Sequence, residues 1–371
     1  MVNLAHRMIA HDWLRFAITI TGVAFAVTLV LVQVGLFQGI LAYATVSIER
    51  TDADLWVTPR GTPNVDFTAS FPETLVSRVR SVEGVARAAN LIVMFAQVTQ
   101  PNGVREGVML YAMEDFAGWN LPWSVNGTEV TPRDLRRGAY VLLDESARKR
   151  FGPYQVGDSR EFINRRLRII GTTNEARSFT TNPLAFVDFA IAQQLDPTNL
   201  RDRTTYILVK LAPGADRGRV RAELQRRLPN NDIHTKEEFA SRSRRYWLES
   251  TGLGMNMMVT VFLGGLVGVV VVGQTLYTST LDHIKEYATV KAIGGGNRAI
   301  FRVISQQAIL GALVGYALGA AMTFSMIPLL HTLDLWPKVT AAFALEVFVG
   351  TVALCWAASA RRLRPRAVSS E

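Results

Sequence analysis

The segment FAITITGVAFAVTLVLVQVGLFQGILAYATVSI occupies residues 16–48 and contains no charged residue. Its 33 residues exceed the about 20 apolar residues that a helix needs to cross the hydrocarbon core of a bilayer. Three further segments are similar: residues 250–281 and 303–333 carry no charge, and residues 339–360 carry only Glu346. Helices of soluble proteins rarely continue past about 25 residues without caps or a charged face. The sequence therefore predicts four transmembrane helices.

The predicted boundaries follow these four segments. We place the transmembrane helices at residues 16–44, 251–281, 303–332 and 339–360. Outside them lie an amphipathic N-terminal segment at 1–15, a large domain at 45–250, a loop at 282–302 and a tail at 361–371. The tripeptide at residues 42–44 has the form of a signal-peptide cleavage site, but the uncharged run before it is longer than the about 15 residues of a signal core. We expect an uncleaved anchor.

Basic residues in short loops predict the orientation, because they mark the cytoplasmic side of a membrane protein. They gather in both tails and in the 282–302 loop, whereas residues 333–338 contain only Lys338. Both termini and this loop are therefore expected in the cytoplasm, and residues 45–250 outside it. The basic residues in the two tails and this loop are Arg7, Arg15, Lys285, Lys291, Arg298, Arg302, Arg361, Arg362, Arg364 and Arg366. The predicted localisation is multi-pass in the cytoplasmic (inner) membrane.

Composition excludes several classes of protein. The 371 residues are 49% hydrophobic and 19% charged, with a mean hydropathy of +0.16, which is not the composition of a disordered chain. The single cysteine, Cys355, excludes an intramolecular disulfide and a cysteine-cluster metal site. The net charge of +9 raises the question of nucleic acid, but no nucleic-acid-binding motif is present and the excess basic charge follows the predicted cytoplasmic loops. We expect no nucleic-acid partner.

The extracytoplasmic domain alternates strand-like and helix-like segments. Strands are expected at 54–58, 85–98, 104–113, 139–143 and 206–211, and helices at 72–82, 145–150 and 216–228. Pro101-Asn102-Gly103 between two of the strands is a strong hairpin signal. We expect a mixed α+β domain with two subdomains. Residues 239–253 have a helical pattern that runs directly into the second transmembrane segment. This pattern fits two interpretations, a continuous helix that couples the domain to the membrane and an ordinary juxtamembrane stalk.

The chain lacks the motifs of enzymatic chemistry. It contains no Gly-Lys pair, and hence no phosphate-binding loop of the form G-x-x-x-x-G-K-[ST]. It also lacks G-x-S-x-G and H-E-x-x-H, and its histidines (His6, His11, His234, His283 and His331) have no close acidic or histidine set around them. We therefore predict no catalytic residue, no metal site and no cofactor in this chain. Its cytoplasmic segments are too short to fold as an ATPase, so any energy must come from a partner.

The 282–302 loop is the most informative cytoplasmic segment. Ile284, Ala288, Lys291 and Ala292 have helical spacing, and the triple glycine at 294–296 favours helix termination. Asn297 can cap the helix that leads into the third transmembrane segment. The pattern predicts a short helix that presents Glu286, Tyr287 and Lys291 at the membrane face. A lever for a partner and a passive interfacial helix are both open.

This loop carries a resemblance to a known family. Its sequence KEYATVKAIG, at residues 285–294, followed by a polar turn and a second helix, resembles the loop of the MacB/FtsX-like ABC transporter permeases, and within them the DevC-like branch. Three other stretches are also similar to this branch. They are residues 3–22, with the I-x-x-T-G-V-A-F entry to the first span that ends at residue 25, ADLWV at 53–57 and SVEGV at 81–85. Tyr287 replaces an aliphatic residue that is commoner in MacB-like members, which favours DevC.

The resemblance implies a homodimer in the lipid bilayer, each subunit docked on a separate ABC ATPase that binds ATP-Mg. Mechanotransmission would then move the external domains, together with a membrane fusion adaptor and an outer-membrane channel, to export an amphipathic lipid, glycolipid or hydrophobic compound. The alternatives are an FtsX-like regulator of an extracytoplasmic partner and a lipoprotein-releasing permease. The ATPase-coupling helix implied by the resemblance comprises Ile284, Lys285, Glu286, Tyr287, Ala288, Lys291, Ala292 and Gly294.

The predicted spans also carry small and polar residues in a pattern. Glycines spaced four apart lie on one face of a helix and permit close approach of a neighbour: Gly35 and Gly39, Gly264 and Gly268, and Gly311, Gly315 and Gly319. These glycine faces fit two roles, helix packing within one subunit and a dimer interface. Gln33 is polar within the first span, and Glu346 is the only carboxylate inside a span. Because an ionisable group in the bilayer is costly, Glu346 is a candidate for a substrate or coupling role.

Overall fold

The computed structural model describes residues 13–122, 125–126, 131–174, 176, 183–282, 297–333 and 335–360. It divides into two compact units, which are described separately. The first comprises Met1–Ile40 together with Leu253–Glu371, and the second comprises Leu41–Gly252. The boundary between the two units falls close to both ends of the predicted extracytoplasmic domain.

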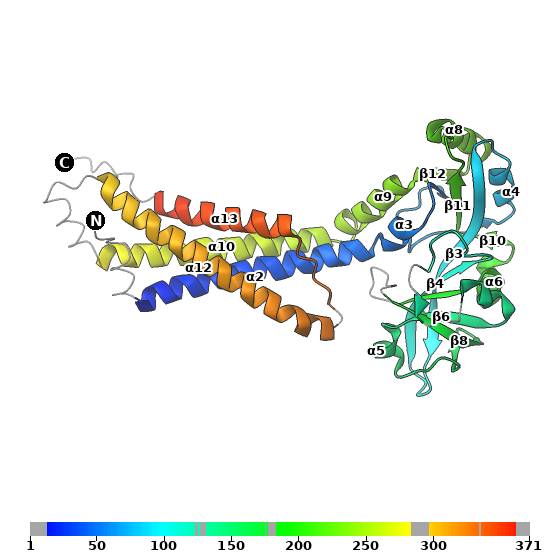
Figure 1. Cartoon of the computed structure of the whole chain (residues 1–371), viewed down its shortest axis with the longest axis horizontal. Helices are drawn as coiled ribbons and strands as arrows, with labels where there is room; N and C mark the ends of the chain where they lie inside the picture. The colour runs from blue at the N-terminus through cyan, green and yellow to red at the C-terminus, as the bar shows by residue number, and fades with distance from the viewer. Residues whose placement is uncertain are drawn as a thin grey trace. The chain divides into compact units, whose positions relative to one another are not determined.

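The first unit is built from four long apolar helices (Figure 1). These are α2 (Trp13–Tyr43), α10 (Leu253–Asp282), α12 (Asn297–Thr332) and α13 (Ala341–Ala360). Within the described residues, Ala17–Tyr43 and Ser305–Thr332 are long and apolar enough to cross a membrane, and a broken pair formed by Lys236–Glu249 and Gly254–Val267 would make a third span. Ala341–Ala357 is a shorter apolar helix. A count of four spans stays a prediction.

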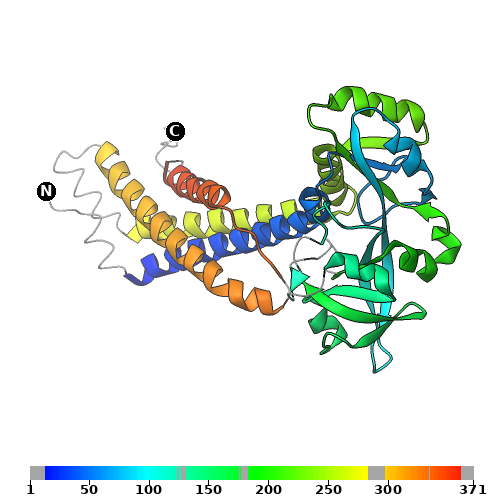
Figure 2. The same cartoon turned by 45° about the vertical axis from the view of Figure 1, so that its right-hand side comes forward.

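Two glycines of α12 bring its backbone against α2. A Cβ added at Gly315 would lie 2.6 Å from Cγ1 of Val23, and one added at Gly319 would lie 2.7 Å from the carbonyl oxygen of Ala24. The Thr28 hydroxyl donates to the Gly319 carbonyl oxygen at 3.1 Å. The two helices therefore touch backbone to backbone, and Figure 2 shows them crossing.

The other glycine positions differ in their surroundings. Gly264 of α10 meets Leu29 of α2, where an added Cβ would lie 2.6 Å from Leu29 Cδ2. Gly35 and Gly39 face the extended connection between α12 and α13 rather than a helix, and the Lys338 amide donates to the Gly35 carbonyl oxygen at 2.7 Å. In this subunit the two glycines therefore pack against the connection that contains Trp336, Pro337 and Lys338.

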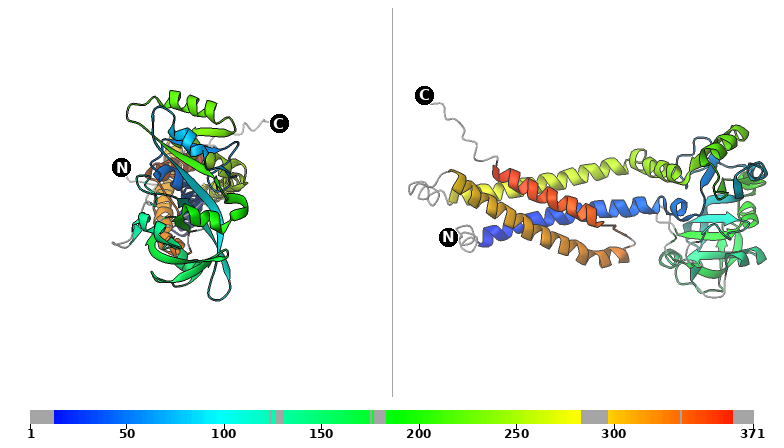
Figure 3. Two further views of the ribbon diagram at one scale, coloured as in Figure 1. Left: turned by 90° about the vertical axis from the view of Figure 1, so that its right-hand side faces the viewer. Right: turned by 45° about the horizontal axis from the view of Figure 1, so that its top comes forward.

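The second unit is organised around β3 (Val85–Thr99), a strand of 15 residues that belongs to both halves of a ten-stranded sheet. Its first half pairs with β11 (Tyr206–Leu211), and its second half pairs with β4 (Arg105–Met113). Figures 2 and 3 show this strand running through the whole unit. The predicted hairpin at residues 101–103 joins β3 to β4 and is confirmed.

Each half of the sheet continues from β3 in its own direction. The order beyond β11 is β1 (Leu55–Pro59) and then β12 (Asn231–Thr235). The order beyond β4 is β9 (Leu184–Asp188), β6 (Tyr140–Asp144), β8 (Arg165–Thr173) and β5 (Val125–Asn126), with β4–β9 and β6–β8 parallel. Strand β7 (Ser159–Phe162) pairs with β3 and β8, and β2 (Phe71–Pro72) pairs with β10 (Arg203–Thr204) in a separate ribbon.

Short helices cover the sheet because each has one apolar face. Val220 and Leu224 of α8 (Arg217–Arg227) pack with Val79 of α4 (Leu75–Arg80) and with the inner residues of β1 and β11. Around β4, β6 and β9 a second cluster includes Phe151 of α5 (Ala147–Phe151). The remaining helices in this unit are α3 (Val46–Arg50), the 3-10 helix η1 (Pro132–Arg137), α6 (Phe189–Leu195), α7 (Pro197–Leu200) and α9 (Lys236–Glu249).

Of the two alternatives left open for residues 239–253, the continuous helix is not the one found. Helix α9 ends at Glu249, and α10 begins at Leu253. Gly252 between them has a φ of +71°, a left-handed conformation that glycine adopts without strain and that ends a helix. The Thr251 hydroxyl donates to the Trp247 carbonyl oxygen at 2.6 Å and satisfies one of the last carbonyls of α9.

The contact between α12 and α2 can be tested with two matched glycine substitutions. We expect Gly319→Ala to lower stability by about 1–3 kcal/mol, because the new methyl group must displace the α2 backbone. Gly350→Ala in α13 is the control, since an added Cβ there has open space around it. The control should be neutral or stabilising by up to about 1 kcal/mol, as alanine is the better helix former. Thermal unfolding of the full chain in lipid nanodiscs measures both. Equal behaviour of the two variants would contradict the packing.

Candidate functional site

The elements that begin and end the second unit pack against each other. Helix α3 follows α2 after only Ala44 and Thr45, and α9 precedes α10 by three residues. The two helices are neighbours in the structure, as Figure 1 shows. The chain therefore enters and leaves this unit through one pair of helices. We call α3 and α9, together with Ala44, Thr45 and residues 250–252 that link them to α2 and α10, the α3–α9 joint.

Side chains of α9 reach the first residues of α3. The Ser243 hydroxyl is fully buried and donates to the Ala44 carbonyl oxygen at 3.2 Å. Arg244 Nη2 donates to Glu49 Oε1 at 2.7 Å, and the Thr45 hydroxyl donates to the same oxygen at 2.9 Å. The ion pair is close to half exposed on both sides, so it contributes at most about 1 kcal/mol to stability. The ion pair matters for geometry rather than for stability, because it sets which turn of α9 faces α3.

Helix α9 is attached firmly to the sheet at its other end. The Phe239 ring is fully buried among Trp56, Tyr206 and His234, with ring centroids 5.4, 5.8 and 5.7 Å away. Burial lowers the pKa of His234, which favours the neutral ring that stacks on Phe239. A capping box at Thr235 satisfies the first amides of the helix. Displacing α9 therefore requires moving the sheet with it.

The chain that follows α3 is fixed to β11 by charge. Lys210 Nζ donates to Asp52 Oδ1 at 2.5 Å, and this hydrogen bond raises the pKa of Lys210. Asp54 Oδ2 accepts a hydrogen bond from the Leu211 amide at 2.8 Å. Arg87 of β3 pairs with Asp52 at 3.1 Å and lies over the Trp119 ring. Both helices of the joint are thus bound to the same sheet.

The polar groups of the joint bind one another rather than a ligand. Within the described residues no group of three or more histidine, cysteine, aspartate or glutamate side chains could hold a metal ion. The joint pairs no nucleophile with a base. Its arrangement therefore suits transmission of movement, since two chain segments that enter one sheet together must shift together.

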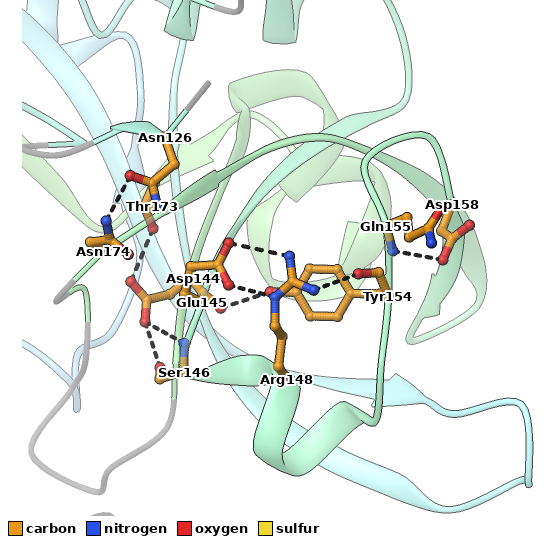
Figure 4. A network of polar contacts seen from close by, with 10 residues as sticks. All are labelled: Asn126, Asp144, Glu145, Ser146, Arg148, Tyr154, Gln155, Asp158, Thr173 and Asn174. Carbon is orange, nitrogen blue, oxygen red and sulfur yellow. Dashed lines mark hydrogen bonds and ion pairs between the residues drawn. The ribbon is translucent and has the colours of Figure 1, made fainter. Parts of the chain in front are cut away.

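A second buried polar network, drawn in Figure 4, is structural as well. The Asp144 carboxylate accepts hydrogen bonds from the Ser146 amide and hydroxyl, from the Thr173 hydroxyl and from the Ala176 amide. Burial nevertheless raises the pKa of Asp144. Beside it, Glu145 pairs with Arg148, which also donates to the Tyr154 carbonyl oxygen at 2.9 Å. These contacts bind the ends of β6 and β8 to the chain that follows β8.

Comparison with known proteins decides the family. A family model described as MacB-like periplasmic core domain matches residues 16–227, and one described as FtsX-like permease C-terminal matches residues 258–364. The chain belongs to the MacB/FtsX-like family of ABC transporter permeases. The resemblance stated from the loop motif is confirmed for this family, and the DevC-like branch within it stays a prediction.

Individual relatives of this permease agree with the family assignment. An uncharacterized ABC transporter permease of Mycobacterium tuberculosis is 25% identical over 318 residues, which is 85% of this chain and 82% of the relative. The macrolide export ATP-binding/permease protein MacB of Mannheimia succiniciproducens is 23% identical over 328 residues, covering 83% of this chain and 50% of the relative.

Two solved structures are similar to about half of the permease. The periplasmic region of MacB from Actinobacillus actinomycetemcomitans aligns with a TM-score of 0.39 and 13% identity, covering 51% of this chain and 92% of that one. The extracellular domain of the transporter YknZ from Gram-positive bacteria aligns with a TM-score of 0.36 and 16% identity, covering 49% of this chain and 99% of that one.

The residues singled out from the sequence fall in different places in the permease. All members of the predicted coupling helix, from Ile284 to Gly294, lie outside the described residues. Gln33 is half-buried in α2, and Glu346 is exposed on α13. Gly311 is buried in α12, and Gly268 lies within α10. The structure therefore brings Gly315, Gly319 and Gly264 to α2 and leaves Glu346 at the surface of its unit.

The residues of the joint were not predicted from the sequence. Ser243 and Arg244 occur in the polar run Ser241–Arg245 of a helical segment, where nothing distinguishes them from their neighbours, and Glu49 is simply the first charge after an apolar run. The only available signal was position, because these segments adjoin the first two predicted spans. A search for polar residues within one turn of each span boundary would have included Thr45 and Thr251 but not Glu49.

The attachment of α9 can be tested at Phe239. We expect Phe239→Ala to destabilise the second unit by about 3–5 kcal/mol, because it leaves a cavity between three rings. Phe239→Leu is the matched control and should cost clearly less, since it keeps most of the apolar volume. Thermal unfolding of the full chain, followed by tryptophan fluorescence, measures the difference between the variants. A loss of less than about 1 kcal/mol in the alanine variant would show that Phe239 does not hold the helix.

Proposed function

We propose that this permease transmits ATP-driven motion from a separate ATPase subunit to its extracytoplasmic domain through the α3–α9 joint. The observation that carries the proposal is that both chain connections to this domain end in one joint, which is bound to the central sheet through Phe239, Asp52 and Asp54. A displacement of either connection is then passed to the sheet. Family membership supports the ATPase partner, because ABC permeases work with one.

In the proposed arrangement four helices cross the cytoplasmic membrane, with residues 1–15, 282–302 and 361–371 in the cytoplasm. The residues from Ile284 to Gly294 form the helix that docks on the ATPase, which binds ATP-Mg. The permease acts as a homodimer and, as in the DevC-like branch that its loop resembles, works with a membrane fusion adaptor and an outer-membrane channel. The substrate class that fits this arrangement is an amphipathic lipid, glycolipid or hydrophobic compound.

Docking and transmission can be separated by substitutions at two places. Glu286→Arg should prevent co-purification with the ATPase, because it replaces the one acidic residue of the docking helix with a basic residue. Arg244→Glu should leave co-purification intact but reduce transmission, because it places two carboxylates together at the joint. The charge exchange Glu49→Arg with Arg244→Glu is the matched control and should restore transmission, since the pair again has opposite charges.

Transmission is measured as the change in amide hydrogen exchange of residues 236–249 when the complex is trapped with ATP and vanadate. We expect a clear change in the wild-type complex, little change in Arg244→Glu, and recovery in the charge-exchanged variant. A stable complex with Glu286→Arg would contradict the docking role. An unchanged response in Arg244→Glu would contradict the role of the joint.

A further inference from the structure

One edge of β3 is interrupted at its middle. Strand β4 covers the opposite edge from Ile92 to Thr99 without a register shift. On the near edge, β11 pairs only as far as Leu91, and β7 pairs only with Val98 and Thr99. Between these two neighbours, the part of the chain that the structure describes places no strand beside residues 93–97.

The direction of the backbone groups shows which of them face this gap. The Val93 amide donates to the Thr205 hydroxyl at 2.8 Å, and the Gln97 carbonyl oxygen accepts from the Ile163 amide at 2.8 Å, so the odd-numbered residues point away from β4. In a strand the N–H and C=O of alternate residues point to the same edge. Both backbone groups of Phe95, the carbonyl of Val93 and the amide of Gln97 therefore point into the gap.

The gap opens on a cleft of about 830 Å³. Its lining comes from residues 59–70, from Val93 to Phe95 and from the 196–205 segment. The side chains of Phe95 and Phe67 are 53% and 51% exposed, which places apolar surface beside the unpaired backbone. An unpaired edge next to exposed aromatic side chains is the arrangement with which proteins bind an extended peptide as an added strand.

A buried carboxyl group in the same cleft adds a charge preference. Oδ2 of Asp66 is buried and has no hydrogen-bond partner within the described residues, and burial raises the pKa of Asp66 to about 7. Of the two basic residues that line the cleft, Arg203 is held by Ser70, and Arg60 is exposed. A buried carboxylate without a partner is costly, and a cationic side chain that reaches it would remove this cost.

We propose that this cleft binds an extended peptide segment of a protein partner, which joins the sheet at the free edge of β3 and presents a basic side chain to Asp66. The segment pairs with Val93, Phe95 and Gln97 and fills the space between β11 and β7. Its apolar side chains lie on Phe95 and Phe67. This inference does not rest on the proposed transmission of motion, because it is argued from the β3 edge and from Asp66. Phe67 at the cleft also contacts the rings of Tyr246 and Trp247 of α9.

The test uses the full chain in lipid nanodiscs and a fluorescent, end-blocked heptapeptide of alternating threonine and valine with one central lysine. Binding is followed by fluorescence anisotropy. Two N-methylated forms of the peptide, methylated at odd or at even positions, separate strand addition from other binding. One form should bind and the other should not, because only one edge of the added strand donates to β3. Equal affinities of both forms would overturn the proposal.

Variants of the permease test the two recognition elements. Phe95→Pro removes the unpaired amide but leaves the β3–β4 hydrogen bonds, and Phe95→Ala is the control that keeps the amide. We expect the proline variant to bind the lysine peptide about tenfold more weakly than the alanine variant, with the same thermal unfolding. Asp66→Asn should abolish the preference for lysine over norleucine at the central position. Equal binding by the two Phe95 variants, or no saturable binding by the wild-type chain, would overturn the proposal.

Discussion

The burial of Phe239 among Trp56, Tyr206 and His234 is the contact on which the rest of the second unit, Leu41–Gly252, depends. It joins the last helix of the unit to β1, β11 and β12. Because Ser243 and Arg244 lie on the next turns of the same helix, their contacts with Ala44 and Glu49 are placed by this anchor. Without it, α3 and α9 would be two separate connections to the membrane helices. With it, they form one joint attached to the sheet, which is the basis of the proposed transmission.

The long strand β3 extends this mechanical unit across both halves of the sheet. Arg87 near its start binds Asp52 beside the joint, and its far end pairs with β4 and β7. One strand is therefore shared by the two halves of the sheet. In the middle of this strand, neither β11 nor β7 covers the edge opposite β4. The sharing of β3 therefore creates the surface to which we assign peptide binding.

Several parts of the fold could be predicted because their signals are local. Long uncharged segments identify the apolar helices, and Pro101-Asn102-Gly103 identifies the β3–β4 hairpin. The pairing of β3 with β11 could not be predicted, because Leu91 and Tyr206 are 115 positions apart and neither carries a mark of the other. The parallel pairs β4–β9 and β6–β8 have the same difficulty. The end of α9 could not be predicted, because the helical pattern of residues 239–253 is compatible both with a continuous helix and with a separate stalk.

The functional residues also differ in whether their signal in the sequence is local or depends on distant segments. The loop sequence at 285–294 was informative because it is a contiguous motif, and it led to the correct family. The joint and the β3 edge are formed only when distant segments meet, so Ser243 and Phe95 have no distinctive sequence context. Gly315 and Gly319 show an intermediate case. Their spacing predicted close approach, whereas the partner helix α2 is known only from the structure.

The most direct test of the central claim is a cross-link across the joint. Cysteines at positions 49 and 244, in a chain with Cys355→Ala, are joined by a short bismaleimide, and the vanadate-trapped complex with the ATPase is examined by hydrogen exchange over residues 54–58 of β1. The account predicts a reduced nucleotide response before cross-linking and a restored response after it, because the joint again moves as one unit. A response that is full before cross-linking, or absent after it, would contradict the account.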